Sequence, residues 1–253
     1  MAGTSMARIS RRGNYGIDEP RWPALNAGFG AVCLAGAALA RRRPGRWAAL
    51  AWPAGLFGIL LMGSAANYLH TTTRGKFAVW EELLSDLNLR GSETVLDMGC
   101  GRGAVLLMAA QLLPNGRAIG IDLWRTAEQS GNDPEVTRRN AKLEGVEGRV
   151  ELHTGDVRAM PFADASTDVV LSSLAIHNIH EAGGRLQALD EAIRVLRPDG
   201  RLVIADIHYV ADAYADHLKE RSMDDIQVRD LGWRFWYGGP WVATSVITAR
   251  KPR

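Results

Sequence analysis

The chain has 253 residues, of which 47% are hydrophobic and 23% are charged, and its formal net charge at pH 7 is +2. This length accommodates one α/β domain of about 180 residues together with an appendage. Its two cysteines, Cys33 and Cys100, lie far apart in the sequence, which excludes a disulfide framework and indicates an intracellular protein, and no Cys/His pair has the spacing of zinc ligands.

The charge is distributed unevenly along the chain. Residues 1–69 contain eight arginines and two acidic residues, a net charge of +6, so residues 70–253 carry −4. The larger, mildly acidic part lacks the basic surface that nucleic acids require, so no nucleic-acid partner is expected. The basic excess accompanies apolar segments, which favours contact with lipid headgroups.

Two uncharged apolar segments follow a basic tail of residues 1–21. They cover residues 24–40 and 48–69, and each approaches the roughly 20 residues that a helix needs to cross a bilayer. Aromatic residues that favour the membrane interface lie near their ends, at Trp22, Trp47, Trp52 and Tyr68. The connection, residues 41–46, is too short for anything but an antiparallel turn. Residues 22–69 are therefore predicted to form a two-helix transmembrane hairpin.

Small residues in both segments are expected to bring the two helices together. Ala27, Ala31 and Ala35 recur at four-residue spacing in the first segment, and the second contains Gly55 and Gly58. Helices in lipid approach closely where their side chains are small. A helix pair buried in a soluble protein and a re-entrant hairpin in one leaflet remain open alternatives. A signal peptide is disfavoured because a second apolar segment follows.

The arginines give conflicting indications of orientation. Four lie in the loop of residues 41–46, which would place this loop in the cytoplasm. Six basic residues flank the outer ends of the hairpin, four in the tail together with Arg74 and Lys76. We expect both outer ends, and with them a larger domain of residues 70–253, to be cytoplasmic. A re-entrant hairpin would also remove the conflict.

The larger domain opens with a predicted amphipathic helix over residues 76–89 and a strand that ends near Asp97. Glycines at alternate positions follow, and the turn contains Gly99, Cys100, Gly101 and Gly103. A helix is expected over residues 104–113. Alternating glycines expose backbone N–H groups and direct the helix N-terminus at a ligand, which favours a binding loop.

Four interpretations of this glycine turn compete. It lacks the Lys-Ser/Thr ending of a phosphate-binding loop, which argues against an NTPase. Its Gly-x-Gly-x-Gly spacing and the preceding Asp97 also differ from the dinucleotide fingerprint. A ligand-binding turn of another kind and a purely structural turn remain.

An acidic residue ends the second predicted strand, residues 118–121. Asp122 lies roughly 20 residues beyond the glycine turn, the distance of one βαβ crossover, where a carboxylate accepts hydrogen bonds from ribose hydroxyls. Leu123 and Trp124 follow and are candidates to cover an adenine face. Capping of the next helix is an alternative role for Asp122 and is compatible with ribose binding.

Further strands alternate with helices, which predicts a parallel, doubly wound sheet. Strands are expected over residues 150–153, 168–173 and 202–206, with a helix over 185–196 and a turn at 197–200. Residues 233–237 and 242–248 flank Gly238-Gly239-Pro240, which predicts a C-terminal hairpin. Its aromatic residues either line an apolar cleft or cover the edge of the sheet.

These motifs resemble those of the class I S-adenosylmethionine (SAM)-dependent methyltransferases, in the same order and spacing over residues 76–250. In the resembled family, the residue matching Asp156 holds the adenine amino group and the one matching Val157 packs on the ring, and residues 196–202 also fit the pattern. The resemblance implies an α/β fold: a doubly wound, mostly parallel seven-stranded sheet with a C-terminal antiparallel hairpin, preceded here by the two-helix transmembrane hairpin. It also implies SAM as the cofactor, and no metal is expected.

The residues expected to bind the cofactor come from these motifs. They are Asp97, Gly99, Cys100, Gly101, Gly103, Asp122, Leu123, Trp124, Asp156, Val157 and Ser173. In the resembled family the segment of residues 173–180 faces the transferred methyl group. His177 in this segment is the candidate general base, because imidazole titrates near neutral pH; alternatively, His177 only braces the loop. Asp206 and His208 form a weaker second pair.

The same segment narrows the acceptor. Methyltransferases of nucleic-acid base amino groups usually carry Asn/Asp-Pro-Pro-aromatic where this chain has Ser172-Ser173-Leu174-Ala175, and related arsenite methyltransferases need several cysteines. We therefore expect a membrane-anchored methyltransferase for a small-molecule or lipid acceptor, with membrane lipids as further partners. The rival hypothesis is a membrane-tethered SAM-binding protein without turnover. The sequence leaves the oligomeric state open.

Overall fold

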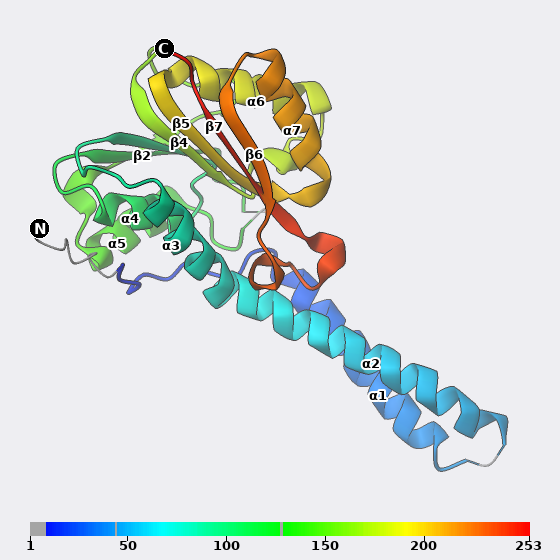
Figure 1. Ribbon diagram of the computed structural model, residues 1–253. Coiled ribbons are helices and arrows are strands. Elements are labelled where there is room, and N and C mark those ends of the chain that lie inside the picture. The colour runs from blue at the N-terminus through cyan, green and yellow to red at the C-terminus, as the bar shows by residue number, and fades with distance from the viewer. Residues whose placement is uncertain (1–8, 44, 127–128) are drawn as a thin grey trace, which may run out of the picture.

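The structure is a computed structural model that describes residues 9–43, 45–126 and 129–253. It consists of an α/β domain from which a long helical hairpin projects (Figure 1). The strands of the domain are β1 (Thr94–Met98), β2 (Arg117–Asp122), β3 (Val150–Thr154), β4 (Thr167–Ser173), β5 (Leu196–Ile207), β6 (Asp224–Asp230) and β7 (Thr244–Arg250). They form a seven-stranded sheet in the order β3-β2-β1-β4-β5-β7-β6.

The pairing of the strands confirms the predicted fold class. Among the described strands, only β7 runs antiparallel to its neighbours, which are β5 and β6, and the other pairs are parallel. The glycine turn, Asp122 and the segment after β4 all lie at the carboxyl ends of neighbouring parallel strands. In such sheets ligands bind at this edge.

Helices cover both faces of the sheet. They are α3 (Lys76–Asp86), α4 (Ala104–Gln111), α5 (Pro134–Glu144), α6 (Ala182–Val195) and α7 (His208–Glu220). Val95 of β1 packs in a core with residues of α3, α4 and α5, whereas the next residue, Leu96, packs in a second core with α6 and α7. Successive side chains of a strand point to opposite faces, so this central strand is buried on both sides, and its buried part is apolar except for Asp97 near the carboxyl end.

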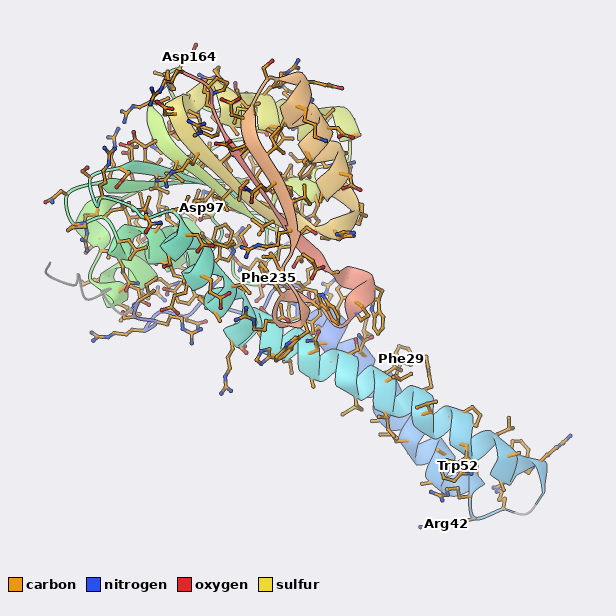
Figure 2. All side chains as sticks on the ribbon, viewed as in Figure 1. Phe29, Arg42, Trp52, Asp97, Asp164 and Phe235 are labelled. Carbon is orange, nitrogen blue, oxygen red and sulfur yellow. The ribbon has the colours of Figure 1, made fainter. Side chains whose placement is uncertain are left out.

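Helices α1 (Arg21–Ala40) and α2 (Arg46–His70) pack together and form the predicted hairpin (Figure 1). Both are long and apolar enough to cross a membrane, and only 17% and 22% of their apolar stretches are buried within the protein. Figure 2 shows side chains such as Phe29 and Trp52 extending outward from the hairpin. These helices therefore do not have the burial of core helices in a soluble protein.

The contact between α1 and α2 differs from the expected alanine stripe. Ala31 and Ala35 are exposed. Buried positions of α1 instead recur every seven residues, at Pro23, Gly30 and Ala37, and α2 repeats this spacing at Ala51, Gly58 and Ala65. A Cβ atom on Gly58 would lie 2.9 Å from the carbonyl oxygen of Gly30. Two long helices that stay in contact meet every seven residues, so a four-residue stripe turns away from the interface.

The expected boundary between residues 69 and 70 falls inside one continuous helix. Helix α2 passes through a π-helical turn, η1 (Thr71–Gly75), directly into α3. Thr71 Oγ1 donates a hydrogen bond to the carbonyl of Trp236 at 2.6 Å. A Cβ on Gly75 would overlap the carbonyl oxygen of Arg234, so glycine is required for this contact. The helical hairpin is thereby continuous with the first helix of the domain.

The basic tail belongs structurally to the larger domain. Residues 1–8, including Arg8, lie outside the described residues. From Ile9 onward the tail packs across α5, where the Glu144 carboxylate accepts hydrogen bonds from the Ser10 and Tyr15 hydroxyls and from two backbone N–H groups. Tyr15 is buried and makes an edge-on contact with Phe77. The chain thus crosses the domain before it enters α1.

The C-terminal hairpin is present, but its strands differ from the expected ones. Strand β7 pairs with β6, not with residues 233–237. Residues 231–243, named here the C-terminal insert, form an irregular connection with two short helices, η4 (Trp233–Phe235) and η5 (Pro240–Val242). The insert packs against α2 and η1, where Phe235 is fully buried and Tyr237 contacts Tyr68. This tertiary contact overrides the local preference of the aromatic run for a strand.

Candidate active site

The glycine turn after β1 forms the floor of the site. Gly99, Gly101 and Gly103 have φ angles of +74°, +49° and +84°, a region that other residues rarely adopt. A Cβ on Gly99 would overlap Cβ of Ala175, and one on Gly101 would lie 2.6 Å from Oε1 of Gln129. The turn is therefore closely enclosed by the segment after β4 and by Gln129.

Two adjoining pockets lie over this turn. The larger cavity has a volume of about 610 Å³ and the smaller one about 220 Å³, and both are lined by Gly99, Asp122, Ala175 and Asn178. Most of the expected cofactor residues line them. The larger cavity contains Asp97, Gly99, Cys100, Gly101, Asp122 and Ser173, and the smaller adds Leu123, Asp156 and Val157.

Two of the expected cofactor residues lie outside the lining of both pockets. Gly103 provides the left-handed residue that starts α4, against Thr137 and Leu107. Trp124 turns its indole away and donates from Nε1 to Thr154 Oγ1, while its backbone N–H donates to Asp122. Trp124 thus contacts Asp122 through its backbone. Of Leu123 and Trp124, only Leu123 has its apolar side chain at the smaller pocket.

Asp122 lies at the junction of the two pockets. Its Oδ2 accepts from the Gly101 N–H at 2.8 Å, and its Oδ1 accepts from the Trp124 N–H at 2.6 Å and from Asn132 Nδ2 at 3.2 Å. These bonds fix the carboxylate to the glycine turn. A carboxylate has about four lone-pair sites, so acceptor capacity remains for hydroxyl groups of a ligand.

Asp97 is a buried acid with an unpaired oxygen. Its side chain is 1% exposed and lines the larger cavity, and Oδ1 has no hydrogen-bond partner among the described residues. Burial, together with the nearby Asp122 carboxylate, raises the pKa of Asp97 to about 7. A cationic group in the cavity would donate a hydrogen bond to the unpaired oxygen and would stabilise the ionised form of Asp97. The α-ammonium group of SAM is such a cation, so this position fits the expected cofactor.

Asp156 is held by its neighbour in the smaller pocket. Arg158 Nε lies 3.0 Å from both carboxylate oxygens, and Arg158 Nη2 lies 2.6 Å from Oδ2. The hydrogen bonds from Arg158 hold the pKa of Asp156 below its usual value. Asp156 is therefore an ionised acceptor, which suits the binding of an adenine amino group.

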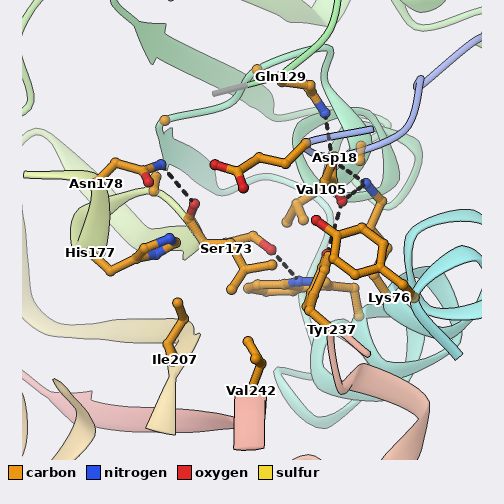
Figure 3. A pocket seen from close by; sticks show the side chains of 18 of the residues that line it. Asp18, Lys76, Val105, Gln129, Ser173, His177, Asn178, Ile207, Tyr237 and Val242 are labelled. Carbon is orange, nitrogen blue, oxygen red and sulfur yellow. Dashed lines mark hydrogen bonds and ion pairs between the residues drawn. The ribbon is translucent and has the colours of Figure 1, made fainter. Parts of the chain in front are cut away.

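His177, which follows β4, forms a pair with Asp206. Asp206 lies near the end of the neighbouring strand β5. His177 Nδ1 donates to Asp206 Oδ1 at 2.5 Å, and the backbone N–H of His177 donates to Oδ2 at 3.1 Å. Asp206 is fully buried and also accepts from the Ile207 N–H and the Tyr214 hydroxyl. Since Nδ1 carries the proton in this arrangement, Nε2 is free to accept one. Figure 3 shows the ring of His177 beside the cavity.

The structure separates the two weaker candidates for the base, Asp206 and His208. His208 Nδ1 contacts Ser245 Oγ at 2.7 Å, and His208 is absent from the lining of both pockets. Asp206 instead orients His177. The sequence signal for the contact of His177 with Asp206 was their position at the ends of β4 and β5, because neighbouring parallel strands end at the same edge of a sheet.

A second polar group was missed by sequence reasoning. Asp18 of the tail accepts hydrogen bonds from Lys76, Thr72, Tyr237 and Gln129, at distances of 2.8 to 3.0 Å. Figure 3 shows Asp18, Lys76, Tyr237 and Gln129 grouped at one side of the cavity. Burial alone would raise the pKa of Asp18, but the Lys76 ammonium and these hydrogen bonds hold it below its usual value. The tail thus closes one wall of the site.

Metal ligands are not gathered at this site. Within residues 9–43, 45–126 and 129–253, no group of three or more His, Cys, Asp or Glu side chains is arranged to hold a metal ion. Cys100 lines the cavity but is buried, and its burial raises the pKa of the thiol well above its usual value. It is therefore a packing residue of the glycine turn and not a reactive thiolate.

Comparisons with known proteins identify relatives of the α/β domain. Residues 89–233 match the family model described as "Methyltransferase domain". The chain is 33% identical over 133 residues to the ubiquinone/menaquinone biosynthesis C-methyltransferase of Dinoroseobacter shibae, covering 52% of this chain and 50% of that protein. It is 32% identical over 172 residues to the 27-O-demethylrifamycin SV methyltransferase of Amycolatopsis mediterranei, covering 66% and 58%. The chain spans about half the length of the curated relatives it matches.

Solved structures share the fold. A geranyl diphosphate methyltransferase in complex with SAM superposes with a TM-score of 0.57 at 17% identity, over 75% of this chain and 90% of that one. A SAM-dependent methyltransferase from Aquifex aeolicus gives a TM-score of 0.54 at 19% identity, over 68% and 88%. At these identities the similarity establishes the architecture of the domain.

Proposed function

The chain belongs to the class I SAM-dependent methyltransferases, and from this premise we propose that it methylates a small or lipidic acceptor that gives up a proton, while its hairpin anchors it in a membrane. The observation that carries the proposed reaction is the His177–Asp206 pair at the cavity wall. SAM supplies a methyl group that is already activated on a sulfonium, so the protein mainly orients the reactants and excludes water.

The two pockets divide the cofactor between them in this proposal. Asp97 in the larger cavity holds the α-ammonium group, and Asp122 at the junction accepts the ribose hydroxyls. Leu123 and Val157 flank the adenine ring in the smaller pocket. Asp156 accepts the adenine amino group in exchange for part of its contact with Arg158, since Arg158 engages both carboxylate oxygens.

His177 is the proposed general base. With its Nδ1 proton donated to Asp206, the imidazole presents Nε2 as an acceptor and removes the proton of a hydroxyl, enol or comparable group. The Asp206 carboxylate then stabilises the imidazolium that forms. Asp206 is a positioning residue, because it acts through His177. Four hydrogen bonds hold this buried carboxylate, so the imidazole has one preferred orientation.

The walls of the larger cavity favour an apolar acceptor. Apart from the Asp18–Lys76 group at one side and the acids Glu19, Asp97 and Asp122, much of the lining is apolar, and it includes Phe77, Trp80, Val105, Met108, Ile207 and Val242. Ubiquinone/menaquinone, demethylrifamycin SV and geranyl diphosphate, which occur in the names of the relatives and neighbours, are small molecules with sizeable apolar parts. Both observations support a small-molecule or lipid acceptor.

The hairpin of residues 22–69 is the proposed membrane anchor. Helix α1 has 20 residues and is about 30 Å long, which equals the apolar thickness of a bilayer. We place residues 1–21 and 70–253 on the cytoplasmic side, where SAM is available. The four loop arginines then lie on the far side or, in a re-entrant hairpin, return to the same face.

The proposed reaction is tested with methyl-labelled SAM and the full chain in its own membranes. The expected result is a labelled product, and His177→Ala is expected to lower turnover by roughly 10²–10⁴-fold with nearly unchanged SAM affinity. His208→Ala is the matched control, because His208 contacts Ser245 and does not line the cavity.

Three outcomes separate the alternatives. Bound SAM without any labelled product would favour a SAM-binding protein without turnover. Normal turnover and an unchanged pH profile in His177→Ala would refute the assignment of the base. Loss of SAM affinity and of thermal stability together with activity would show that His177 only braces the loop.

A further inference from the structure

The larger cavity extends beyond the α/β domain into the base of the hairpin. Its inner end lies at Asp97 and His177. Its outer end is lined by Trp22 and Asn26 of α1, Ser64 and Tyr68 of α2, and Trp241 of the C-terminal insert. One continuous space therefore connects the cofactor site with the two helices that leave the domain.

The outer end contains a polar pair within the largely apolar helices α1 and α2. Asn26 Nδ2 donates to Ser64 Oγ at 3.1 Å, and both side chains line the cavity. Polar side chains are costly inside a membrane helix, and where they occur they usually face a cavity or a substrate path. Here the pair faces the cavity.

The C-terminal insert forms the remaining wall of the outer end through two glycines. Gly238 has a φ angle of +99°, and a Cβ there would lie 2.8 Å from Ser64 Oγ, so the insert lies directly against α2. Gly239 has a φ angle of +154°, and the indole of Trp241 folds over it. The insert thus contributes Trp241 to the lining of the outer end.

Exposed tryptophans mark the level of this outer end. Trp22, Trp233 and Trp241 are all more than half exposed, with Trp241 at 70%. They lie where the hairpin joins the domain, and indole rings favour the interface between lipid and water. At the other end of the hairpin, Trp47 and Trp52 occupy the corresponding position. In the membrane position proposed for the hairpin, the outer end of the cavity lies at the level of the lipid headgroups.

We propose that the acceptor is an amphiphile with an apolar tail that enters the cavity sideways from the bilayer, between the base of the hairpin and the C-terminal insert. Its reacting head group reaches His177, while its tail passes Tyr68, Tyr237 and Trp241 and stays in lipid. This inference rests on the proposed function. It explains why the domain is joined to the hairpin by a continuous helix: a fixed joint keeps the cavity opening at the bilayer surface.

Variants that fill the opening test the route in the full chain reconstituted in phosphatidylcholine vesicles with native lipid extract. Asn26→Phe and Ser64→Phe place a ring at the outer end, and Gly63→Phe is the matched control, since Gly63 is exposed and a Cβ there meets nothing within 4 Å. With methyl-labelled SAM, label in the chloroform-soluble product is expected to fall at least tenfold in the two filling variants. The control is expected to match the unchanged chain, with SAM affinity the same in all.

A second measurement is independent of turnover and of the stability of the variants. A farnesol analogue that carries a diazirine at its tail is dissolved in the vesicles and photolysed with the unchanged chain, and adducts are mapped by mass spectrometry. Adducts on Tyr68, Tyr237 or Trp241 are expected. Adducts confined to outward residues such as Phe29 and Leu56 would overturn the proposed route.

The results separate this inference from the proposed function. Label that enters only a water-soluble product would overturn entry from the bilayer and leave the methyltransferase activity standing. Full activity in Asn26→Phe and Ser64→Phe would do the same. If no product forms, the activity fails, and the adduct map alone then decides whether an apolar tail enters from the bilayer.

Discussion

Helices α1 and α4 have similar apolar composition and opposite surroundings. Six of the eight residues of α4 are buried, whereas three of the 20 residues of α1 are buried. Helix α4 packs between the sheet and neighbouring helices, but α1 contacts mainly α2. Composition alone therefore does not distinguish a helix of the core from a helix whose apolar side chains stay exposed.

The way each helix uses small residues explains this difference. In α4, Leu106 and Leu107 are completely buried and fill a protein core. In the hairpin, Gly30, Gly58 and Ala65 take the buried positions, and the large side chains point outward. Helices that pack together in lipid place small residues at their contact and large apolar residues on the outside. The following predictions test that comparison, from the largest expected effect to the smallest.

Charges on the outward face of α2 are expected to have the largest effect. Leu56 and Leu60 are 60% and 57% exposed. Leu56→Arg combined with Leu60→Arg introduces two cations at a cost of about 2.5–3.5 kcal/mol each in the apolar layer. The double variant is expected to leave the membrane fraction in vesicle flotation, whereas Leu143→Arg on the exposed surface of α5 floats normally. Equal flotation of both would contradict a lipid environment for α2.

Truncation of one leucine in α4 and of one in α2 tests whether each helix packs in a protein core. Leu106→Ala in α4 removes a fully buried side chain and is expected to lower the free energy of unfolding by about 2–5 kcal/mol. Leu60→Ala in α2 is expected to change it by less than about 0.5 kcal/mol. Urea denaturation in detergent measures both. Similar losses would show that α2 packs against protein and not against lipid.

Enlarging a glycine tests the contact between α1 and α2. Gly58→Val places its side chain against the Gly30 carbonyl and Leu34, and overpacking of this kind costs about 1–3 kcal/mol. Gly63→Val points into open space and is the control. Thermal unfolding in detergent, followed by circular dichroism, is expected to shift only for Gly58→Val. An unshifted curve would place the helix contact elsewhere.

The pH dependence of SAM affinity tests the role of Asp97. Among the described residues, Asp97 is the one acid that has a buried oxygen without a hydrogen-bond partner. Because the pKa of Asp97 is raised to about 7, its carboxyl is largely protonated at pH 6 and does not attract an ammonium group. Binding then releases a proton, so affinity is expected to fall about tenfold per pH unit below 7 and to level off above it.

Two variants check this assignment by calorimetry between pH 5 and 8. Asp97→Asn is expected to bind weakly and to lose the pH dependence. Asp156→Asn is expected to bind weakly but keep the slope, because the pKa of Asp156 lies below its usual value and this group stays ionised. A slope that persists in Asp97→Asn would assign it to another group.

The sequence determined the elements of the domain and much of the site. Strand ends were predictable because Asp97, Asp122 and Ser173 each follow an apolar run, and parallel strands bring their carboxyl ends to one edge. The glycine turn was predictable because its φ angles admit few other residues. The hairpin followed from two long uncharged segments, since length and apolar composition are local properties.

Tertiary structure decided which groups meet. His177 and Asp206 are 29 residues apart, and they pair because β4 and β5 are neighbours in the sheet. Asp18 reaches Lys76 and Tyr237 only because the tail crosses the domain before α1. The C-terminal insert became irregular because its aromatic residues pack on α2 and η1. Local sequence fixes which conformations a segment prefers, but contacts between distant segments depend on how the whole chain buries its apolar surface, and no local pattern records that.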